Sequence, residues 1–518
     1  MSTNRTLRSR AGSAFGPGVL EPLERREVLT AVAWTGLGGS NLWSNPANWS
    51  GGAIPSSTSD VVINNPTASL SVVLDAGPVT VRSLTLNERL IINRGVTLSS
   101  PGEINLGADA ELKINGLLNW AAGTWNAGSE PTVNPGGKLN IGRTSAPTQG
   151  VVTLASDLLN RGYLAWRGGT LELTSTGSLT NAATKAMDMS SPMSISGSGR
   201  FENFGLLRRG GLATSTTTID ADFNNDDRVR ILRGTLAFGG ADANQPSMIN
   251  FGTLSGVATG STFLMRAPTF HRDADYLNSA AFVFSTSTHI FRGDIYLGNA
   301  VFGSTSDVSI SQGGARFRGD PTFNDTTLFL EGALTIGGNV AFNSTDVEGS
   351  SMIVTGTLAL TGSNVGTDVS VLASGRINTT GSRITGGVSN AGTISVTSGV
   401  LTLDVQGASG PFVNSGSLLL GSTARLDALG GMVTTGLVQT SISSASFGRV
   451  TVSGNLALGG TLRSIFTGSG FVAGQNRTIL SAGGRTGTFA NVTATGLPVG
   501  MSTTVLYGAT GAVVRLVG

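Results

Sequence analysis

The chain has 518 residues, of which only 12% are charged, 75 are glycine and none is cysteine, so disulfides, cysteine-ligated zinc and thiol nucleophiles are excluded. No apolar run reaches the roughly 18 residues of a membrane-spanning helix, and no transmembrane segment is expected. Five arginines and three glutamates in residues 1–31 account for the net charge of +2, which leaves the rest of the chain balanced and without a general attraction for nucleic acid.

The first predicted element is a targeting segment over residues 1–31, which ends in LEPLERREVLTA (20–31). It resembles the LEPR-x-LL type N-terminal motif of exported planctomycete proteins, and it lacks the apolar core of about 7 to 15 residues found in an ordinary secretory signal. The resemblance implies export to the cell surface or exterior and leaves the export route and the cleavage site open. A short amphipathic helix is the alternative. The residues that carry the motif are Leu20, Glu21, Pro22, Arg25, Arg26, Leu29 and Ala31.

The second predicted element spans residues 32–63 and contains the stretch WTGLGGSNLWSNPANWSGG. This stretch places Trp34, Trp43 and Trp49 among glycine, asparagine and proline residues. Just before the first strands, these rings are expected to close the end of the fold as an N-terminal cap. A platform for sugar rings is the alternative.

Residues 64–447 repeat short runs of alternating apolar and polar residues, such as VTVRSLTL (79–86) and GTLALTGS (356–363), separated by glycine or asparagine. Alternation with period two predicts half-buried strands, and helical spacing is nearly absent. Because an Asn-x-Gly-x-Leu/Ile motif recurs at multiples of 22 to 24 residues, a parallel β-helix of about 22 residues per coil is expected. Glycine would allow the positive φ of a sharp turn, and asparagines would stack. The motif residues are Asn160, Gly162, Asn203, Gly205, Asn250, Gly252, Asn390, Gly392, Asn414 and Gly416.

Residues 448–518 have longer strands and no asparagine repeat, which predicts a C-terminal β cap or docking unit. Both ends resemble autotransporter-passenger-like β-helix proteins, through LWSNPANWSGGAIPSSTSDVVI (42–63) and GNLALGGTLRSIF (454–466). The resemblance implies a secreted or surface solenoid.

Candidate chemistry is sparse. Two acidic clusters occur, at 224–228 and at 271–275, and a metal or acid–base site from His271, His289 and Asp294 is conceivable, although solvated loop histidines are favoured. No phosphate-binding loop, zinc-binding motif or hydrolase motif is present. Outward arginines could form a stripe for acidic glycans, with ordinary ion pairing as the favoured alternative: Arg208, Arg209, Arg228, Arg230, Arg233, Arg316 and Arg318.

Together these features predict an all-β protein, a right-handed parallel β-helix with a small C-terminal β cap. The expected function is structural or adhesin-like, without catalysis, cofactor, metal or nucleic acid, and with carbohydrate or cell-surface proteins as partners. A polysaccharide lyase or glycoside hydrolase on the same scaffold is the alternative, since β-helices also carry such enzymes.

Overall fold

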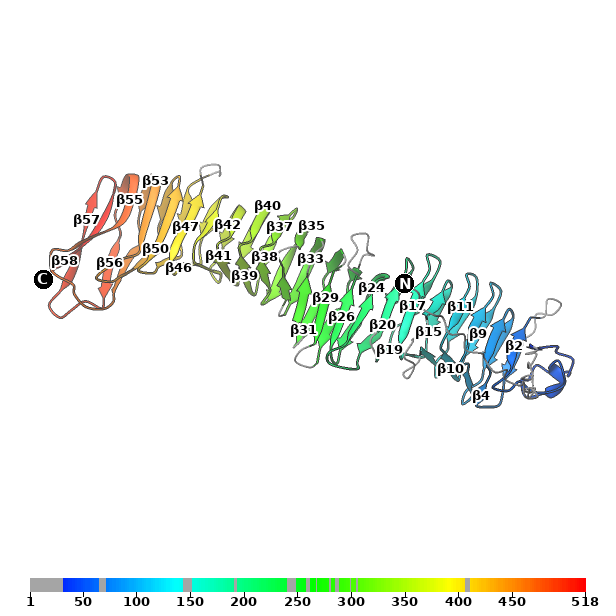
Figure 1. The fold of residues 1–518 in the computed structure, drawn as a ribbon. Coiled ribbons are helices and arrows are strands. Elements are labelled where there is room, and N and C mark those ends of the chain that lie inside the picture. Colours follow the sequence, from blue (N-terminus) through cyan, green and yellow to red (C-terminus); the bar gives the residue numbers. More distant parts are fainter. Residues whose placement is uncertain are drawn as a thin grey trace, which may run out of the picture.

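The computed structural model describes residues 31–64, 71–142, 151–190, 193–239, 248–257, 261–266, 268–278, 281–284, 288–298, 300–303, 306–405 and 410–518. This part of the chain is all β: 58 strands and a single three-residue 3-10 helix, η1 (Pro46–Asn48). The strands stack into a long rod with the cap and the C-terminal hairpin at opposite ends (Figure 1). Apart from Ala31, the targeting motif lies outside the described residues, and no described helix is long and apolar enough to cross a membrane.

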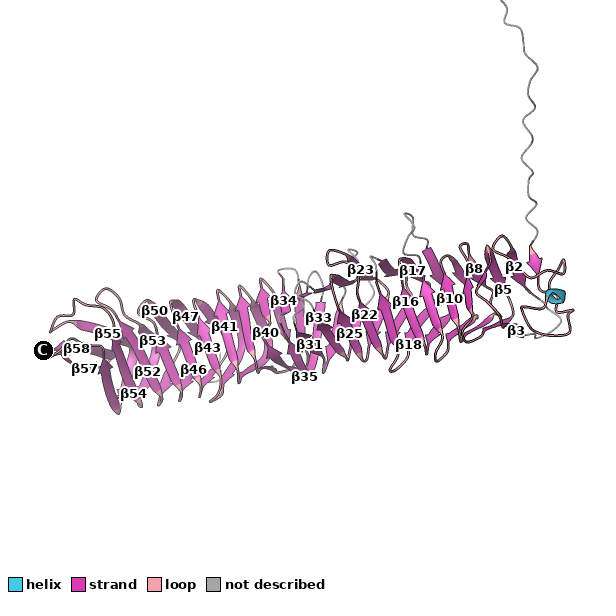
Figure 2. Cartoon of the chain, turned by 90° about the horizontal axis from the view of Figure 1, so that it is seen from below, coloured by secondary structure: helices cyan, strands magenta, loops and turns pink. Residues whose placement is uncertain are grey.

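Each coil of the rod contributes one strand to each of three faces. β2 (Asp60–Ile63) lies on the first face, β3 (Ser71–Leu74) on the second and β4 (Val79–Thr80) on the third, after which β5 (Ser83–Leu86) pairs in parallel with β2. Repetition of this path gives a first face of 22 strands, and Figure 2 shows the successive strands along the rod.

The second and third faces together form a 36-stranded sheet. They are joined because long strands bend around the corner between them and pair on both faces, as β33 (Thr288–Leu297) does with β35 (Asp307–Gly319). A register shift between Phe291 and Gly293 marks this corner. The chain is therefore the parallel β-solenoid that the repeats predict.

Period-two alternation decides which side chains are inside. In β5 the pattern is intermediate, buried, intermediate, buried, so Leu84 and Leu86 face the interior while Ser83 and Thr85 face outward. Inward residues of successive coils lie in register and form continuous ladders. Phe284, Phe302 and Phe323 stack at centroid distances of 4.4 and 4.3 Å. Burial of each such side chain contributes about 1.5 to 3 kcal/mol, so the ladders supply most of the stabilisation.

The N-terminal end of the stack is covered by the tryptophan segment. Trp34 packs edge-to-face on Trp49 at 4.9 Å, and Trp43 packs on Trp49 at 4.6 Å. All three are at most 4% exposed, and the Trp49 indole donates to the Trp43 carbonyl at 2.8 Å. Trp43 also donates its backbone N–H to Val73 at 2.8 Å, which covers the exposed edge of the second face. Buried ring faces cannot serve as a platform for sugars.

At the C-terminal end, parallel pairing continues beyond the expected boundary at residue 448. β53 (Arg449–Leu458), β54 (Thr461–Phe466) and β56 (Asn491–Thr495) extend the ladders of the preceding coils. Antiparallel pairing begins only where β58 (Gly511–Val517) lies along β55 (Asn476–Gly487), followed by β57 (Ser502–Gly508). The terminal cap is therefore a hairpin on the last coils, smaller than the unit expected from the sequence.

Candidate functional site

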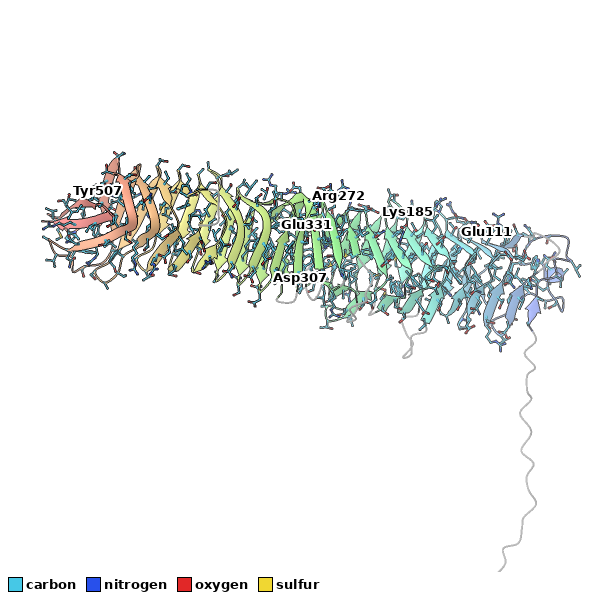
Figure 3. All side chains as sticks on the ribbon, turned by 90° about the horizontal axis from the view of Figure 1, so that it is seen from above. Glu111, Lys185, Arg272, Asp307, Glu331 and Tyr507 are labelled. Atoms are coloured by element: carbon cyan, nitrogen blue, oxygen red, sulfur yellow. The ribbon has the colours of Figure 1, made fainter. Side chains whose placement is uncertain are left out.

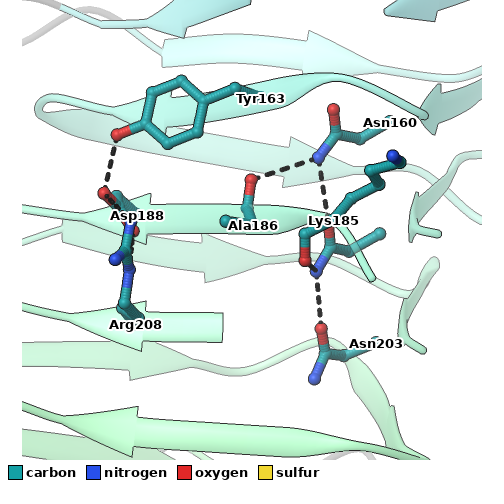
Figure 4. Close-up of polar contacts among 8 residues, drawn as sticks. Asn160, Tyr163, Lys185, Ala186, Asp188, Asn203 and Arg208 are labelled. Atoms are coloured by element: carbon teal, nitrogen blue, oxygen red, sulfur yellow. Dashed lines mark hydrogen bonds and ion pairs between the residues drawn. The ribbon is translucent and has the colours of Figure 1, made fainter. Parts of the chain in front are cut away.

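A column of asparagines is buried at the corner between the second and third faces. It comprises five residues at the ends of β15 (Asp157–Asn160), β18 (Ser178–Asn181), β21 (Arg200–Asn203), β24 (Asp222–Asn225) and β27 (Met248–Asn250), all fully buried. The side-chain amide of each of the first four donates to the side-chain carbonyl of the asparagine in the next coil at 2.7 to 2.8 Å, and Figure 4 shows the first steps of the column. Such a chain satisfies buried polar groups that would otherwise cost about 1 to 3 kcal/mol each. The members are Asn160, Asn181, Asn203, Asn225 and Asn250.

The glycine of the motif has a different role from the one expected. None of the motif glycines adopts a positive φ. Instead, a Cβ at Gly205 would lie 2.4 Å from the Lys185 carbonyl oxygen, and one at Gly252 would lie 2.0 Å from the Asp227 carbonyl oxygen. In these two coils glycine leaves room for the carbonyl of the preceding coil, whereas Lys185 and Asp227 occupy the matching position of neighbouring coils.

Asn390 and Asn414 belong to a separate, shorter column at another corner. They end β45 (Val388–Asn390) and β48 (Phe412–Asn414) on the third face, just before the chain enters the first face. Asn390 donates to Asn414 at 2.7 Å, and Asn414 donates to the Thr434 hydroxyl at 3.0 Å. One sequence motif therefore serves two different corners.

The long column ends at a buried histidine pair. His271 is in register with Asn250, and the Thr269 hydroxyl oxygen lies 2.7 Å from both His271 Nε2 and His289 Nδ1. Both rings are fully buried, and burial lowers the pKa of His271 far below its usual range and that of His289 to about 3. The expectation of solvated loop histidines is wrong, because the inward positions of β30 (Thr269–Arg272) and β33 place them in the core.

Asp294 does not join these histidines. It lies on the outside of the rod and accepts a hydrogen bond from Arg318 at 2.8 Å. The fold therefore does not bring together the three residues considered for a metal or acid–base site. Within the described residues no group of three metal-ligating side chains converges. In the other acidic cluster, Asp226 and Asp227 form the turn between β24 and β25 (Arg228–Ile231).

Arg209 is the exception among the arginines expected outside. It is fully buried, and its guanidinium donates to the Gly210 carbonyl at 2.6 Å and to both the carbonyl and the hydroxyl of Ser215 at 2.6 Å. Burial lowers its pKa. Arg209 therefore closes a loop from inside and is not available to a ligand.

The third face carries a polar contact that spans three coils. Asp188 in β19 (Ala186–Met189) accepts from the Tyr163 hydroxyl of β16 (Tyr163–Trp166) at 2.6 Å and from Arg208 of β22 (Leu206–Arg209) at 2.6 and 2.8 Å (Figure 4). Burial, followed by the hydrogen bond to Asp188, raises the pKa of Tyr163. This exterior array links coils and orients a guanidinium on the surface.

Shallow grooves are present in the described part of the rod. One of about 420 Å³ is lined by Gly293, Gly313, Arg316 and Thr335 among others, and one of about 480 Å³ near the C-terminal hairpin is lined by residues including Arg485. Neither lining includes an aspartate, glutamate or histidine. Glycoside hydrolysis usually needs a pair of carboxyl groups flanking the substrate, and neither groove offers one.

Few known proteins are similar to this chain. No family model and no curated protein matches this chain. Among solved structures, the chain is similar to the Hap adhesin of Haemophilus influenzae, with 10% identity and a TM-score of 0.32 over 88% of this chain and 61% of that one. The chain thus covers less than two thirds of that structure. A likeness at this level transfers no function, and the fold is established here by the strand pairing.

Proposed function

We propose that this protein is an exported, non-catalytic rod with a structural or adhesive role at the cell surface or outside the cell. Support for export comes from the targeting motif LEPLERREVLTA, and support for a rod comes from the unbroken parallel stack. Its partners would be carbohydrate or other surface proteins.

The proposal of a non-catalytic role is supported mainly by the ion pairs that outward-facing carboxylates form. Several of them are paired with arginines on a neighbouring strand: Asp188 with Arg208 at 2.6 Å, and Asp294 with Arg318 at 2.8 Å. Glu111 likewise contacts both Arg89 at 2.6 Å and Lys113 at 2.9 Å. Carboxylates held in this way link coils and are not arranged for acid–base work, which needs a poised pair in a cleft.

The first test is location. Cells producing the full chain are fractionated, and the N-terminus of the mature protein is sequenced. Recovery at the surface or in the medium, with an N-terminal segment removed, is expected. A protein confined to the cytoplasm with an intact N-terminus would contradict the proposal.

The second test is catalysis. The full chain is incubated with a panel of acidic and neutral polysaccharides, and new reducing ends or unsaturated products are measured. No turnover is expected. Turnover that disappears in Asp226→Ala or Asp273→Ala would establish the enzyme alternative.

A further inference from the structure

Basic side chains gather on the third face between β13 (Lys138–Ile141) and β25. Outward positions of these strands and of the adjoining corners, within the described residues, carry eight basic side chains and only three acidic ones, Asp188, Asp226 and Asp227. We call this surface the basic face. Its cations are Lys138, Arg161, Arg167, Lys185, Arg208, Arg228, Arg230 and Arg233.

The neighbouring second face has the opposite charge. Along the same coils its described strands carry Glu130, Asp157, Glu202 and Asp222 outward, with Arg200 as the single base, 3.5 Å from Glu202. Positive and negative side chains are therefore separated onto different faces of the rod, although their total over the chain is balanced. A chain without general attraction for nucleic acid can still have a local region of positive potential, because the surface potential depends on where the charges lie as well as on their sum.

Most cations of the basic face are not neutralised by the protein. Arg208 is held by Asp188, but none of the other seven forms an ion pair with a carboxylate in the described part of the chain. Arg228 and Arg230 project from a single strand with the burial pattern exposed, buried, exposed, buried. They lie about 7 Å apart along that strand. Arg230 is in register with Arg208 one coil away, a spacing of about 4.8 Å.

Apolar surface is interleaved with these cations. Tyr163 lies half-buried between coils that carry Lys138 and Lys185, and Phe204 is 39% exposed beside the strand of Arg208. Guanidinium groups bind carboxylate and sulfate-like oxyanions through paired hydrogen bonds, and aromatic faces pack on sugar rings. Within the described residues this face consists of pleated strands without a helix, the element that commonly enters the major groove of DNA.

We infer that the basic face binds a linear acidic polysaccharide lying along the rod axis, with its anionic groups contacting arginines on successive coils. The inference deepens the proposed function, since it names the ligand class of the surface rod and the face that takes it. It rests on the proposed function only for the place where the protein encounters the polysaccharide. Polysaccharide binding and location at the cell surface can therefore be tested independently.

Binding of the full chain to immobilised heparin tests the inference, with polygalacturonate, dextran and duplex and single-stranded DNA as competitors. Arg228→Glu with Arg230→Glu should weaken heparin binding by about tenfold or more, and added salt should weaken it further. Arg228→Lys with Arg230→Lys should retain most of the binding. The matched control is Arg376→Glu with Arg463→Glu, which makes the same charge change at exposed first-face positions of β43 (Arg376–Thr379) and β54.

Competition by polygalacturonate but not by dextran would support the inference. It would be overturned by equal affinity of the Arg228→Glu/Arg230→Glu variant and the wild type, by equal loss in the control variant, or by DNA that competes more strongly than either acidic polysaccharide. A protein that is exported but does not bind heparin or polygalacturonate overturns this inference alone, whereas one that binds but stays in the cytoplasm overturns the proposed location alone.

Discussion

At the scale of single residues, asparagine is the side chain that most shapes the interior. Asn160, Asn203 and Asn250 carry the Asn-x-Gly motif, whereas Asn181 and Asn225, which complete the column, do not. Asn181 precedes a longer turn, and Asn225 precedes a turn of the usual length with Asp227 in the place of glycine. Their spacing of 21 and 22 residues from the preceding asparagine was nevertheless a usable signal. The column depends on register between coils and does not require the full motif.

Replacement of Asn203 by alanine should interrupt this column. Asn181 would lose its acceptor and Asn225 its donor, and both amides would remain buried. A loss of roughly 2 to 4 kcal/mol in the free energy of unfolding is expected for two unsatisfied groups, measured by guanidinium denaturation. Thr218→Ala, on the outside of the first face, is the control and should change stability little. Equal effects of the two variants would contradict the role given to the column.

The histidine pair predicts how stability depends on pH. The pKa of His289 is lowered from 6.5 to about 3 by burial. Between these values the unfolded chain binds the extra proton, so stability is fully present above about pH 6.5 and is lost as the pH falls toward 3. The loss of stability over this pH range is on the order of 5 kcal/mol.

The measurement is the urea midpoint from pH 7.5 down to pH 4. The slope should be shallower for His289→Gln, in which the buried group cannot be protonated, than for the wild type. If the urea midpoints of the wild type and of His289→Gln change equally with pH, the protonation of His289 does not contribute to the pH dependence of stability.

At the scale of elements, the alternation of each short strand determines which residues are inside, and this was readable from sequence. What the alternation could not give is how the ends of the stack are covered. The N-terminal segment combines a tryptophan cluster with backbone pairing to Val73, while the C-terminal hairpin of β57 and β58 lies antiparallel on β55. Both devices cover sheet edges that would otherwise pair with other chains.

Removal of one ring from the cap tests its role. Trp43→Ala deletes a ring that is 1% exposed and should cost about 3 to 5 kcal/mol locally, because a solenoid is stabilised mainly by neighbouring coils. Hydrogen exchange should accelerate in β2 and β3 and remain unchanged in β50 (Ala424–Leu429). Leu37→Ala, at an 85% exposed position of the same segment, is the control and should leave exchange unchanged. Uniform acceleration along the rod would contradict local capping.

At the scale of the whole molecule, the stack produces a long surface on which every coil presents side chains at a fixed spacing, as Figure 3 shows along the full rod. A repeated outward position becomes a row parallel to the axis, so a few arginines on different coils add up to a charged face. This arrangement is suited to a polymer and offers little enclosure for a small substrate.

The shape can be measured directly. The 22 rungs of the first face, at about 4.8 Å each, give a length of roughly 100 Å. A radius of gyration near 30 Å or more is therefore expected by small-angle scattering, against about 24 Å for a compact domain of this length. A value near the compact figure would contradict the extended rod.

The sequence by itself determined the strand period, the solenoid class and the presence of stacked asparagines, because these depend on local alternation and on repeats. The tertiary structure alone decided which residues share a column. Coils vary in length, with 29 residues between the paired Trp125 and Leu154 but 18 between Phe284 and Phe302, so distance along the chain does not fix register. For that reason the burial of His271, His289 and Arg209, the two separate asparagine corners and the basic face emerge only when the coils are stacked.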